Sequence, residues 1–190
     1  SSLRKKYLYK SHVLKLPILN RLINPSGHFP QADRLDPSKP NLLILGGSLG
    51  AELLNRIIFE NRKDLKHYFN IIHIVGSRDF NSSYKLEDSY VPLEYVGDLG
   101  PVYEITDLCL SRAGAGTLSE LESLNIPALL IPLGGDFSRG DQLLNAEYHV
   151  EKNKNSSILL ESFMDYRHLL SSLQTLQPRS SKHSPKTQEK

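Results

Sequence analysis

The sequence contains a single cysteine, which excludes a disulfide within the chain. Cys109 lies inside an apolar run, so a small buried core residue is its simplest interpretation, and such cysteine use suits a reducing cytosol. No apolar run approaches the roughly 18 residues that a membrane span requires. At 190 residues the chain is long enough for one full α/β domain and too short for two large ones.

Acidic residues are absent from residues 1–23, which hold six Lys and Arg side chains. The whole chain has 23 basic and 21 acidic residues, so residues 24–190 hold 17 basic and 21 acidic ones, a net charge of −4. Without a basic excess, the body of the protein is not expected to bind nucleic acid. The basic segment interleaves apolar side chains with its charges, which suits an anionic membrane surface, and an ordinary solvated helix or connector fits it equally.

The chain also opens without a methionine, so we expect a processed product or a fragment of a longer protein. Residues 1–23 are interpreted as a basic connector or a remnant of an adjoining domain. A linker rich in Pro and Gly leads into a single domain that we place at 24–177. Residues 178–190 are polar and lack periodicity, which predicts a disordered tail.

Apolar runs alternate with helical patterns from residue 41 onward. We expect strands at 41–45, 70–76, 93–99, 107–111, 127–133 and 156–161. Helices are expected at 51–65, 117–124, 140–153 and 161–176, with a short helical turn at 100–106. This alternation predicts an α/β domain with a Rossmann-like parallel sheet and helices on both faces.

Three glycine-rich or polar loops follow predicted strands: "GGSLG" after 41–45, "RAGAG" after 107–111 and "GGDFSRGD" after 127–133. Ligands of parallel sheets bind at the carboxyl ends of the strands, so we expect all three loops along one rim. The first loop also fits a G-x-S-x-G nucleophile elbow built on Ser48. A nucleophile elbow also needs an oxyanion loop built from an earlier strand, but only a basic segment and a proline-rich linker precede this strand and loop. No histidine lies in a later strand-end loop, so a phosphate cradle is favoured over a hydrolase.

The second loop carries small residues at its tip and leads into a helix. Main-chain N–H groups of Ala115, Gly116, Thr117 and Leu118 can therefore approach a diphosphate at the helix N-terminus. A dinucleotide fingerprint is disfavoured because Ser119 stands where its third glycine belongs. We expect Glu120 within the first turn, where it would accept bonds from ribose hydroxyls, unless it only complements the helix dipole. Asp141 and Gln142 suit sugar hydroxyls, although Asp141 would also serve as an N-cap.

The order and spacing of four motifs resemble the C-terminal domain of the MurG family, over roughly residues 24–160. The motifs are Gly46-Gly47-Ser48-x-Gly50, Arg112-x-Gly114-x-x-Thr117-x-x-Glu120, Pro127-x-x-x-x-Pro132 and Gln142-x-x-Asn145-Ala146. MurG-like proteins are bacterial GT-B hexosyltransferases that move N-acetylglucosamine from UDP-N-acetylglucosamine to the undecaprenyl-diphospho-muramoyl-pentapeptide lipid of peptidoglycan synthesis. The resemblance implies the C-terminal, donor-binding half of that fold.

Carried over residue by residue, the resemblance implies a complete donor site. The Ser48 loop contacts the diphosphate, the main chain of Val96 meets uracil, residues 115–120 (Ser119 among them) wrap the phosphates and ribose, and Gln142 holds the sugar. It implies no metal and no cofactor, because loop amides stabilise the UDP leaving group. The catalytic base of the family lies in an N-terminal acceptor domain, so no catalytic residue is expected in this chain.

The implied partners are UDP-N-acetylglucosamine, the lipid-linked acceptor, the missing N-terminal domain and a peripheral contact at the cytoplasmic face of the plasma membrane.

The chain departs from the family at one motif. Where the family has Asn-Pro-x-Arg, this chain has Asn24-Pro25-Ser26-Gly27, which leaves His28 or Arg34 as substitutes for the arginine. Two alternatives stay open. One is a subunit of a two-chain transferase with a membrane partner, and the other is a degenerate, non-catalytic nucleotide-sugar-binding domain.

Overall fold

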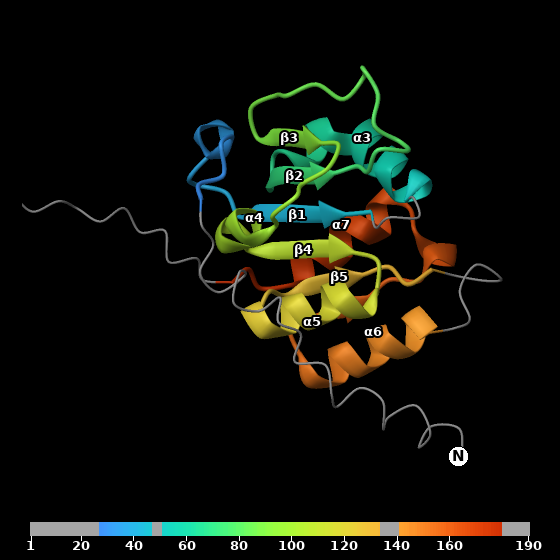
Figure 1. Cartoon of the computed structure of the whole chain (residues 1–190). Helices are drawn as coiled ribbons and strands as arrows, with labels where there is room; N and C mark the ends of the chain where they lie inside the picture. The colour runs from blue at the N-terminus through green and yellow to red at the C-terminus, as the bar shows by residue number, and fades with distance from the viewer. Residues whose placement is uncertain (1–26, 47–50, 134–140, 180–190) are drawn as a thin grey trace, which may run out of the picture.

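The computed structural model describes residues 27–46, 51–133 and 141–179 (Figure 1). Six parallel strands form one sheet in the order β3-β2-β1-β4-β5-β6. Their bounds are β1 Asn41–Leu45, β2 Asn70–Ile74, β3 Tyr90–Leu93, β4 Leu108–Ser111, β5 Ala128–Leu130 and β6 Ser157–Ile158. The predicted Rossmann-like α/β fold is therefore confirmed.

Helices cover both faces of the sheet. In Figure 1, α4 (Gly100–Ile105), α5 (Ala115–Leu124) and α6 (Asp141–Lys152) lie in front, whereas α3 (Glu52–Leu65) and α7 (Tyr166–Thr175) lie behind. Two short 3₁₀ helices, η1 (Ala32–Arg34) and η3 (Glu161–Phe163), complete the described elements. Alternate strand residues supply two separate cores: Leu42 and Ile44 pack toward α3 and α7, and Leu43 and Leu45 pack toward α4, α5 and α6. This two-sided burial explains why the strands read as continuous apolar runs.

Two predicted elements differ from the structure. The strand expected at 93–99 is wrong: β3 ends at Leu93, and the last ladder bond runs from the Gly76 amide to the Glu94 carbonyl at 3.1 Å. The apolar run Tyr90–Leu93 is the true strand, and it tolerates Pro92 because it lies at the sheet edge. The closing helix expected at 161–176 is divided, because Asp165 caps a new helix by accepting a bond from the His168 amide at 2.9 Å.

Polar side chains close the amino-terminal edge of the sheet. The buried Asn70 side chain accepts from the Asp36 amide and donates to the Asp36 carbonyl and to Asn41 Oδ1, each at 2.8 Å. Asp107 Oδ2 accepts from the Asn41 amide, also at 2.8 Å. These bonds tie the linker before β1 to the starts of β1, β2 and β4.

Arg179 belongs to the same edge. Its guanidinium donates to the Leu124 carbonyl at 3.1 Å, to the Tyr103 carbonyl at 2.9 Å and to the Glu104 carbonyl at 3.0 Å. A cation here satisfies the final carbonyls of α4 and α5 and complements both helix dipoles. Ordered contacts thus continue two residues beyond the boundary that we expected at 177. Residues 1–26 and 180–190, which hold the predicted connector and most of the predicted tail, lie outside the described residues.

A buried histidine ties α3 to β2. His73 Nε2 lies 2.9 Å from Asn55 Oδ1, and His73 Nδ1 lies 3.2 Å from the Tyr90 hydroxyl. The Asn55 amide nitrogen donates to the Val75 carbonyl at 3.0 Å and to Asp79 Oδ2 at 2.8 Å. Because Asn55 Oδ1 must accept, the ring carries its proton on Nε2 and accepts from Tyr90 at Nδ1.

No helix among the described residues has the length and apolarity needed to cross a bilayer.

Candidate functional site

The order of the strands places a switch point between β1 and β4. From β1 the chain proceeds to β2 on one side, whereas β4, β5 and β6 follow on the other. Leu45 and Ser111, at the ends of β1 and β4, stand opposite each other in the register. Ligands of doubly wound sheets bind outside the carboxyl ends of the strands at such a point. The "GGSLG" and "RAGAG" loops leave from these two strands, and the third predicted loop leaves from the adjacent β5.

The first loop is described only at its ends. Ser48, with its neighbours at 47–50, lies outside the described residues, as do residues 134–140 of the third loop. A Cβ on Gly46 would lie 2.9 Å from the Ala51 Cβ and 3.4 Å from Asn55 Oδ1. Gly46 therefore serves the close packing of α3 on β1. Ala51 precedes α3 without a side-chain capping bond, so within the described part of the chain no side-chain cap satisfies the first amides of α3.

The start of α5 offers main-chain donors to an anion. Its N-cap is Gly114, which has no side chain to cap the helix. The Leu118 amide already donates to the Gly114 carbonyl at 3.0 Å, and the amides of Ala115, Gly116 and Thr117 have no acceptor among the described residues. A Cβ at Gly114 or Gly116 would meet nothing within 4 Å among the described residues. Open space and unpaired amides together suit a phosphate group.

Glu120 is the sixth residue of α5 and lies in the second turn, which corrects the expected first-turn position. The helix dipole acts mainly within the first turn. A carboxylate in the second turn therefore complements the dipole only weakly, which favours the ribose role of Glu120 over the dipole role. The Tyr103 hydroxyl donates to Glu120 Oε2 at 2.8 Å. Ser119, before it, uses its carbonyl to accept from the Ser123 hydroxyl at 2.7 Å.

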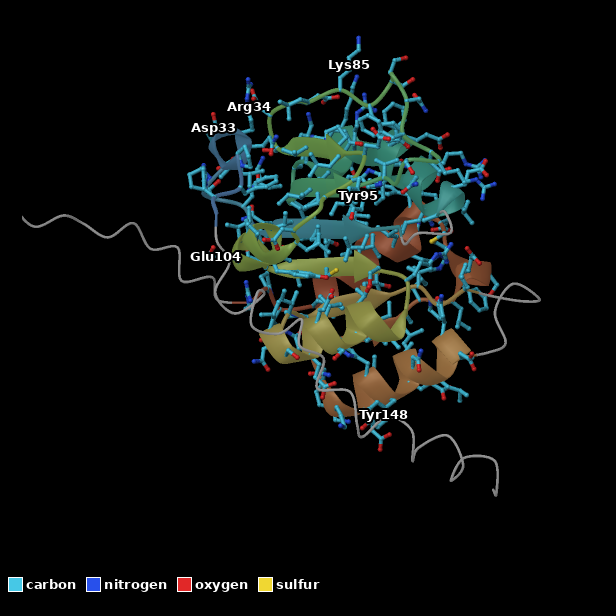
Figure 2. The ribbon with its side chains drawn as sticks, viewed as in Figure 1. Asp33, Arg34, Lys85, Tyr95, Glu104 and Tyr148 are labelled. Carbon is cyan, nitrogen blue, oxygen red and sulfur yellow. The ribbon has the colours of Figure 1, made fainter. Side chains whose placement is uncertain are left out.

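Val96 lies in the segment 94–99 that leads from β3 to α4. Its side chain packs against the same apolar cluster as Leu118 and Leu121 of α5, so the predicted uracil and ribose positions adjoin one cluster. Asp98 Oδ1 accepts from the Gly100 amide at 2.9 Å and fixes the end of this segment. The neighbouring Tyr95 is 78% exposed and lies near the carboxyl ends of the strands (Figure 2).

The start of α6 adds polar groups from the next loop. Asp141 is its first residue and is exposed. Gln142 Oε1 accepts from the Leu133 amide at 3.0 Å, which leaves the amide N–H groups of its side chain as donors. The Asn145 side chain donates to the Ala113 carbonyl at 3.4 Å. The helix that carries Gln142 is thus tied to the second loop at Ala113 and to the segment after β5 at Leu133.

A buried ion pair was missed by the sequence reasoning. Arg112, the first residue after β4, places Nη2 2.6 Å from Glu161 Oε1 and Nη1 3.3 Å from the Ile131 carbonyl. Its side chain is only 8% exposed. Arg112 therefore holds the ends of β4 and β5 to η3 and is directed away from solvent. No sequence signal links Arg112 to Glu161, which was expected inside a helix 49 residues away.

Arg34 is not at the candidate site. It lies in η1 at the amino-terminal edge, where its carbonyl accepts from the Ser89 amide at 3.0 Å and its guanidinium pairs with the exposed Asp88 at 3.4 Å (Figure 2). The missing linker arginine is therefore not replaced by Arg34, and His28 remains the other cationic candidate. Among the described residues, no group of three or more His, Cys, Asp or Glu side chains is placed to hold a metal ion.

Comparisons with known proteins agree with this geometry. Residues 41–190 match the model of the glycosyltransferase family 28 C-terminal domain. The chain is a member of glycosyltransferase family 28. The match covers the sheet from β1 onward, which includes the switch point and the start of α5.

Curated relatives of the family 28 domain share one name: UDP-N-acetylglucosamine--N-acetylmuramyl-(pentapeptide) pyrophosphoryl-undecaprenol N-acetylglucosamine transferase. The relative from Clostridium botulinum (strain Loch Maree / Type A3) is 41% identical over 140 residues, which are 73% of this chain and 39% of the relative. The relative from Clostridium tetani (strain Massachusetts / E88) is 39% identical over 147 residues, 77% of this chain and 41% of the relative. The chain thus spans about two fifths of the length of these proteins.

Solved structures give the same picture. MurG of Acinetobacter baumannii superposes with a TM-score of 0.58 at 27% identity and covers 74% of this chain and 44% of its own. The calicheamicin glycosyltransferase CalG4 superposes with a TM-score of 0.61 at 16% identity, over 80% of this chain and 37% of its own, and this likeness shows the fold alone. The predicted resemblance to the C-terminal domain of MurG-like GT-B transferases is confirmed.

Proposed function

We propose that this family 28 domain binds UDP-N-acetylglucosamine as the donor half of an inverting hexosyltransferase. The observation that carries the proposal is the start of α5, where uncapped amides and two glycines with open space above them stand one and a half turns before Glu120. The relatives named above are transferases of N-acetylglucosamine, and their name supplies the donor sugar.

Each part of the donor has a matching group in the proposed site. The diphosphate lies at the amides of Ala115, Gly116 and Thr117, with the Ser48 loop as a second contact. Glu120 accepts hydrogen bonds from the ribose hydroxyls, and the main chain of Val96 faces uracil. Asp141 accepts from a sugar hydroxyl, while Gln142 donates to one, because its carbonyl is already engaged by Leu133.

The chemistry follows from this arrangement. As an acceptor hydroxyl attacks the anomeric carbon, negative charge develops on the departing UDP. Fixed amides and the positive end of a helix stabilise that charge where it forms. No residue of this chain is assigned as the general base, so we expect the isolated polypeptide to bind the donor without transferring it.

The full reaction needs partners that we propose from the relatives. The acceptor is the undecaprenyl-diphospho-muramoyl-pentapeptide lipid of peptidoglycan synthesis, as the relatives' name states for them. An N-terminal domain would bind this lipid and supply the base. We place the assembly peripherally at the cytoplasmic face of the plasma membrane, where the basic residues 1–23 suit an anionic surface.

Calorimetric titration with UDP-N-acetylglucosamine, UDP-glucose and UDP tests the proposal. Glu120→Ala should weaken binding of all three ligands, whereas Gln142→Ala should weaken binding of only the two sugar nucleotides. The matched control is Glu122→Ala, two residues further along α5, where the side chain is about half exposed and pairs only loosely with Lys152 at 3.8 Å. A folded wild-type chain that binds none of the ligands would overturn the donor site, and detectable sugar transfer by the chain alone would overturn the absence of a base.

A further inference from the structure

The hydrogen bond between Tyr103 and Glu120 joins two helices at the proposed ribose position. The Tyr103 ring belongs to α4 and is 1% exposed, whereas Glu120 belongs to α5 and is half-buried. The bond measures 2.8 Å from the hydroxyl to Oε2. Among the described residues it is the only hydrogen bond of the Tyr103 hydroxyl, so the ring presents its one polar atom to this carboxylate.

The direction of this hydrogen bond is fixed. Burial, with the nearby Glu120 charge, raises the pKa of Tyr103 well above its ordinary value, so the hydroxyl keeps its proton. A carboxylate only accepts hydrogen bonds. Cys109 belongs to the same buried apolar cluster as Tyr103, and burial raises the pKa of its thiol to about 12, so no thiolate competes for the Tyr103 proton. Tyr103 therefore always donates to Oε2, and no described residue donates to Oε1.

Such a bond limits how the carboxylate can rotate. A half-exposed Glu side chain samples several rotamers, and ordering it when a ligand binds costs conformational entropy. Because the Tyr103 hydroxyl holds Oε2, the plane of the carboxylate is set before the ligand binds. Oε1 then stays available to accept a hydrogen bond from the ligand. Arg179 supports this geometry from the opposite end, because its guanidinium bonds to the last carbonyls of both α4 and α5.

We propose that Tyr103 is a positioning residue that orients Glu120 toward the ribose hydroxyls of the nucleotide. This inference rests on the proposed function, because it needs UDP to bind with its ribose at Glu120. Tyr103 itself does not touch the ligand. It acts through Glu120, and its effect should therefore depend on the presence of ribose hydroxyls.

The test compares UDP with 2′,3′-dideoxy-UDP, which lacks both ribose hydroxyls, by calorimetry on the full chain. Tyr103→Phe removes only the hydroxyl and keeps the buried ring. We expect it to weaken UDP binding roughly 5- to 10-fold, the range that one hydrogen bond of ordinary strength represents. Binding of dideoxy-UDP should not change. In a Glu120→Ala background, Tyr103→Phe should have no further effect on UDP.

Tyr148→Phe is the matched control, because Tyr148 lies on α6 (Figure 2), where Lys152 stands over its ring, and Tyr148 has no hydrogen bond to Glu120 among the described residues. Thermal melting establishes that each variant is folded. Equal losses for UDP and dideoxy-UDP would show a merely structural role and overturn the positioning role. Normal UDP binding by Tyr103→Phe, when Glu120→Ala weakens UDP binding, would also overturn the positioning role. UDP binding that Glu120→Ala leaves intact would instead overturn the ribose assignment of the proposed function itself.

Discussion

The two edges of the sheet are built in opposite ways. At the amino-terminal edge, Asn70, Asp107 and Arg179 bond to main-chain groups of segments far apart in the sequence. At the carboxyl-terminal edge, α3 and α5 begin without side-chain caps from the described residues, which also leave open space around Gly114 and Gly116. The first edge directs most of its polar side chains to internal partners, although Asp107 Oδ1 is buried without one among the described residues, and the second edge keeps main-chain donors available.

This difference separates residues that stabilise the fold from residues that we expect to bind a ligand. When a buried polar group loses its hydrogen-bond partner, the free energy of unfolding falls. The loss is small when the group faces solvent, because water replaces the partner. Substitutions at the amino-terminal edge should therefore change stability and leave UDP affinity intact. Substitutions at the start of α5 should do the reverse. The four predictions below examine this separation in order of expected effect.

The largest effect is expected at the Arg112–Glu161 pair, which is an internal polar contact at the carboxyl-terminal edge. Glu161→Ala leaves the Arg112 guanidinium buried without its carboxylate, and we expect a loss of about 3–5 kcal/mol in the free energy of unfolding. Urea denaturation measures this loss. Glu122→Ala, which breaks the exposed pair with Lys152, is the control and should cost under about 1 kcal/mol. Similar losses in both variants would show that the Arg112–Glu161 pair contributes no more to stability than an exposed pair.

At the amino-terminal edge, Asn70→Ala leaves the Asp36 amide without a partner and removes one of two donors to the Asp36 carbonyl, which also accepts from the Lys39 amide at 3.1 Å. We expect a loss of about 2–3 kcal/mol in the free energy of unfolding measured by urea denaturation, since the partly buried groups bonded to the Asn70 side chain lose that partner. UDP affinity should stay at the wild-type value. Asn81→Ala, in an exposed loop, is the control and should change neither quantity. Weakened UDP binding by a folded Asn70→Ala protein would contradict the separation of the two edges.

Two glycines at the carboxyl-terminal edge should behave differently. Gly46→Ala forces a Cβ to 2.9 Å from Ala51, and repacking of α3 should cost about 1–3 kcal/mol of stability. Gly116→Ala meets no atom and improves helix propensity, so stability should hold or rise by up to about 1 kcal/mol. Yet its methyl group occupies the space proposed for phosphate, so calorimetry should show weaker UDP binding. Unchanged UDP affinity in Gly116→Ala would argue against the phosphate position.

The smallest effect concerns pH. Burial lowers the pKa of His73 from its ordinary value near 6.5 to about 3. Between those values the unfolded chain binds a proton that the folded chain does not, so stability should fall as the pH drops below about 6.5, by up to about 1.4 kcal/mol per pH unit.

Urea unfolding at about pH 7 and about pH 5.5 measures this slope. His73→Gln should reduce it, whereas His67→Gln, at an exposed position, should leave it unchanged. An equal slope in wild type and His73→Gln would assign the pH dependence to other groups.

The sequence predicted the parts of the fold that follow from local patterns. Apolar runs located five of the six strands, and the glycine-rich loops were expected along the rim where the strands have their carboxyl ends. The sixth, β3, was displaced because "LEYV" is nearly as apolar as "YVPL", and only pairing with β2 distinguishes them.

The side-chain contacts of the candidate site were less predictable. Glu120 was chosen for its chemistry, but its partner Tyr103 lies on another helix, and a contact between helices depends on packing. Arg179 illustrates the same limit, since a polar stretch without periodicity predicted disorder there. Its three bonds exist only because the ends of α4 and α5 converge in the folded chain.

Both ends of the described chain meet the same short helix. A Cβ on Gly27 would lie 3.7 Å from the Pro101 ring, and Arg179 bonds to Tyr103 and Glu104. Since α4 has six residues and is about 9 Å long, the two ends are close neighbours. A short linker could therefore join residue 179 to residue 27, and a circular permutant opened in the exposed loop near Asn81 should keep the sheet, the switch point and the proposed donor site intact.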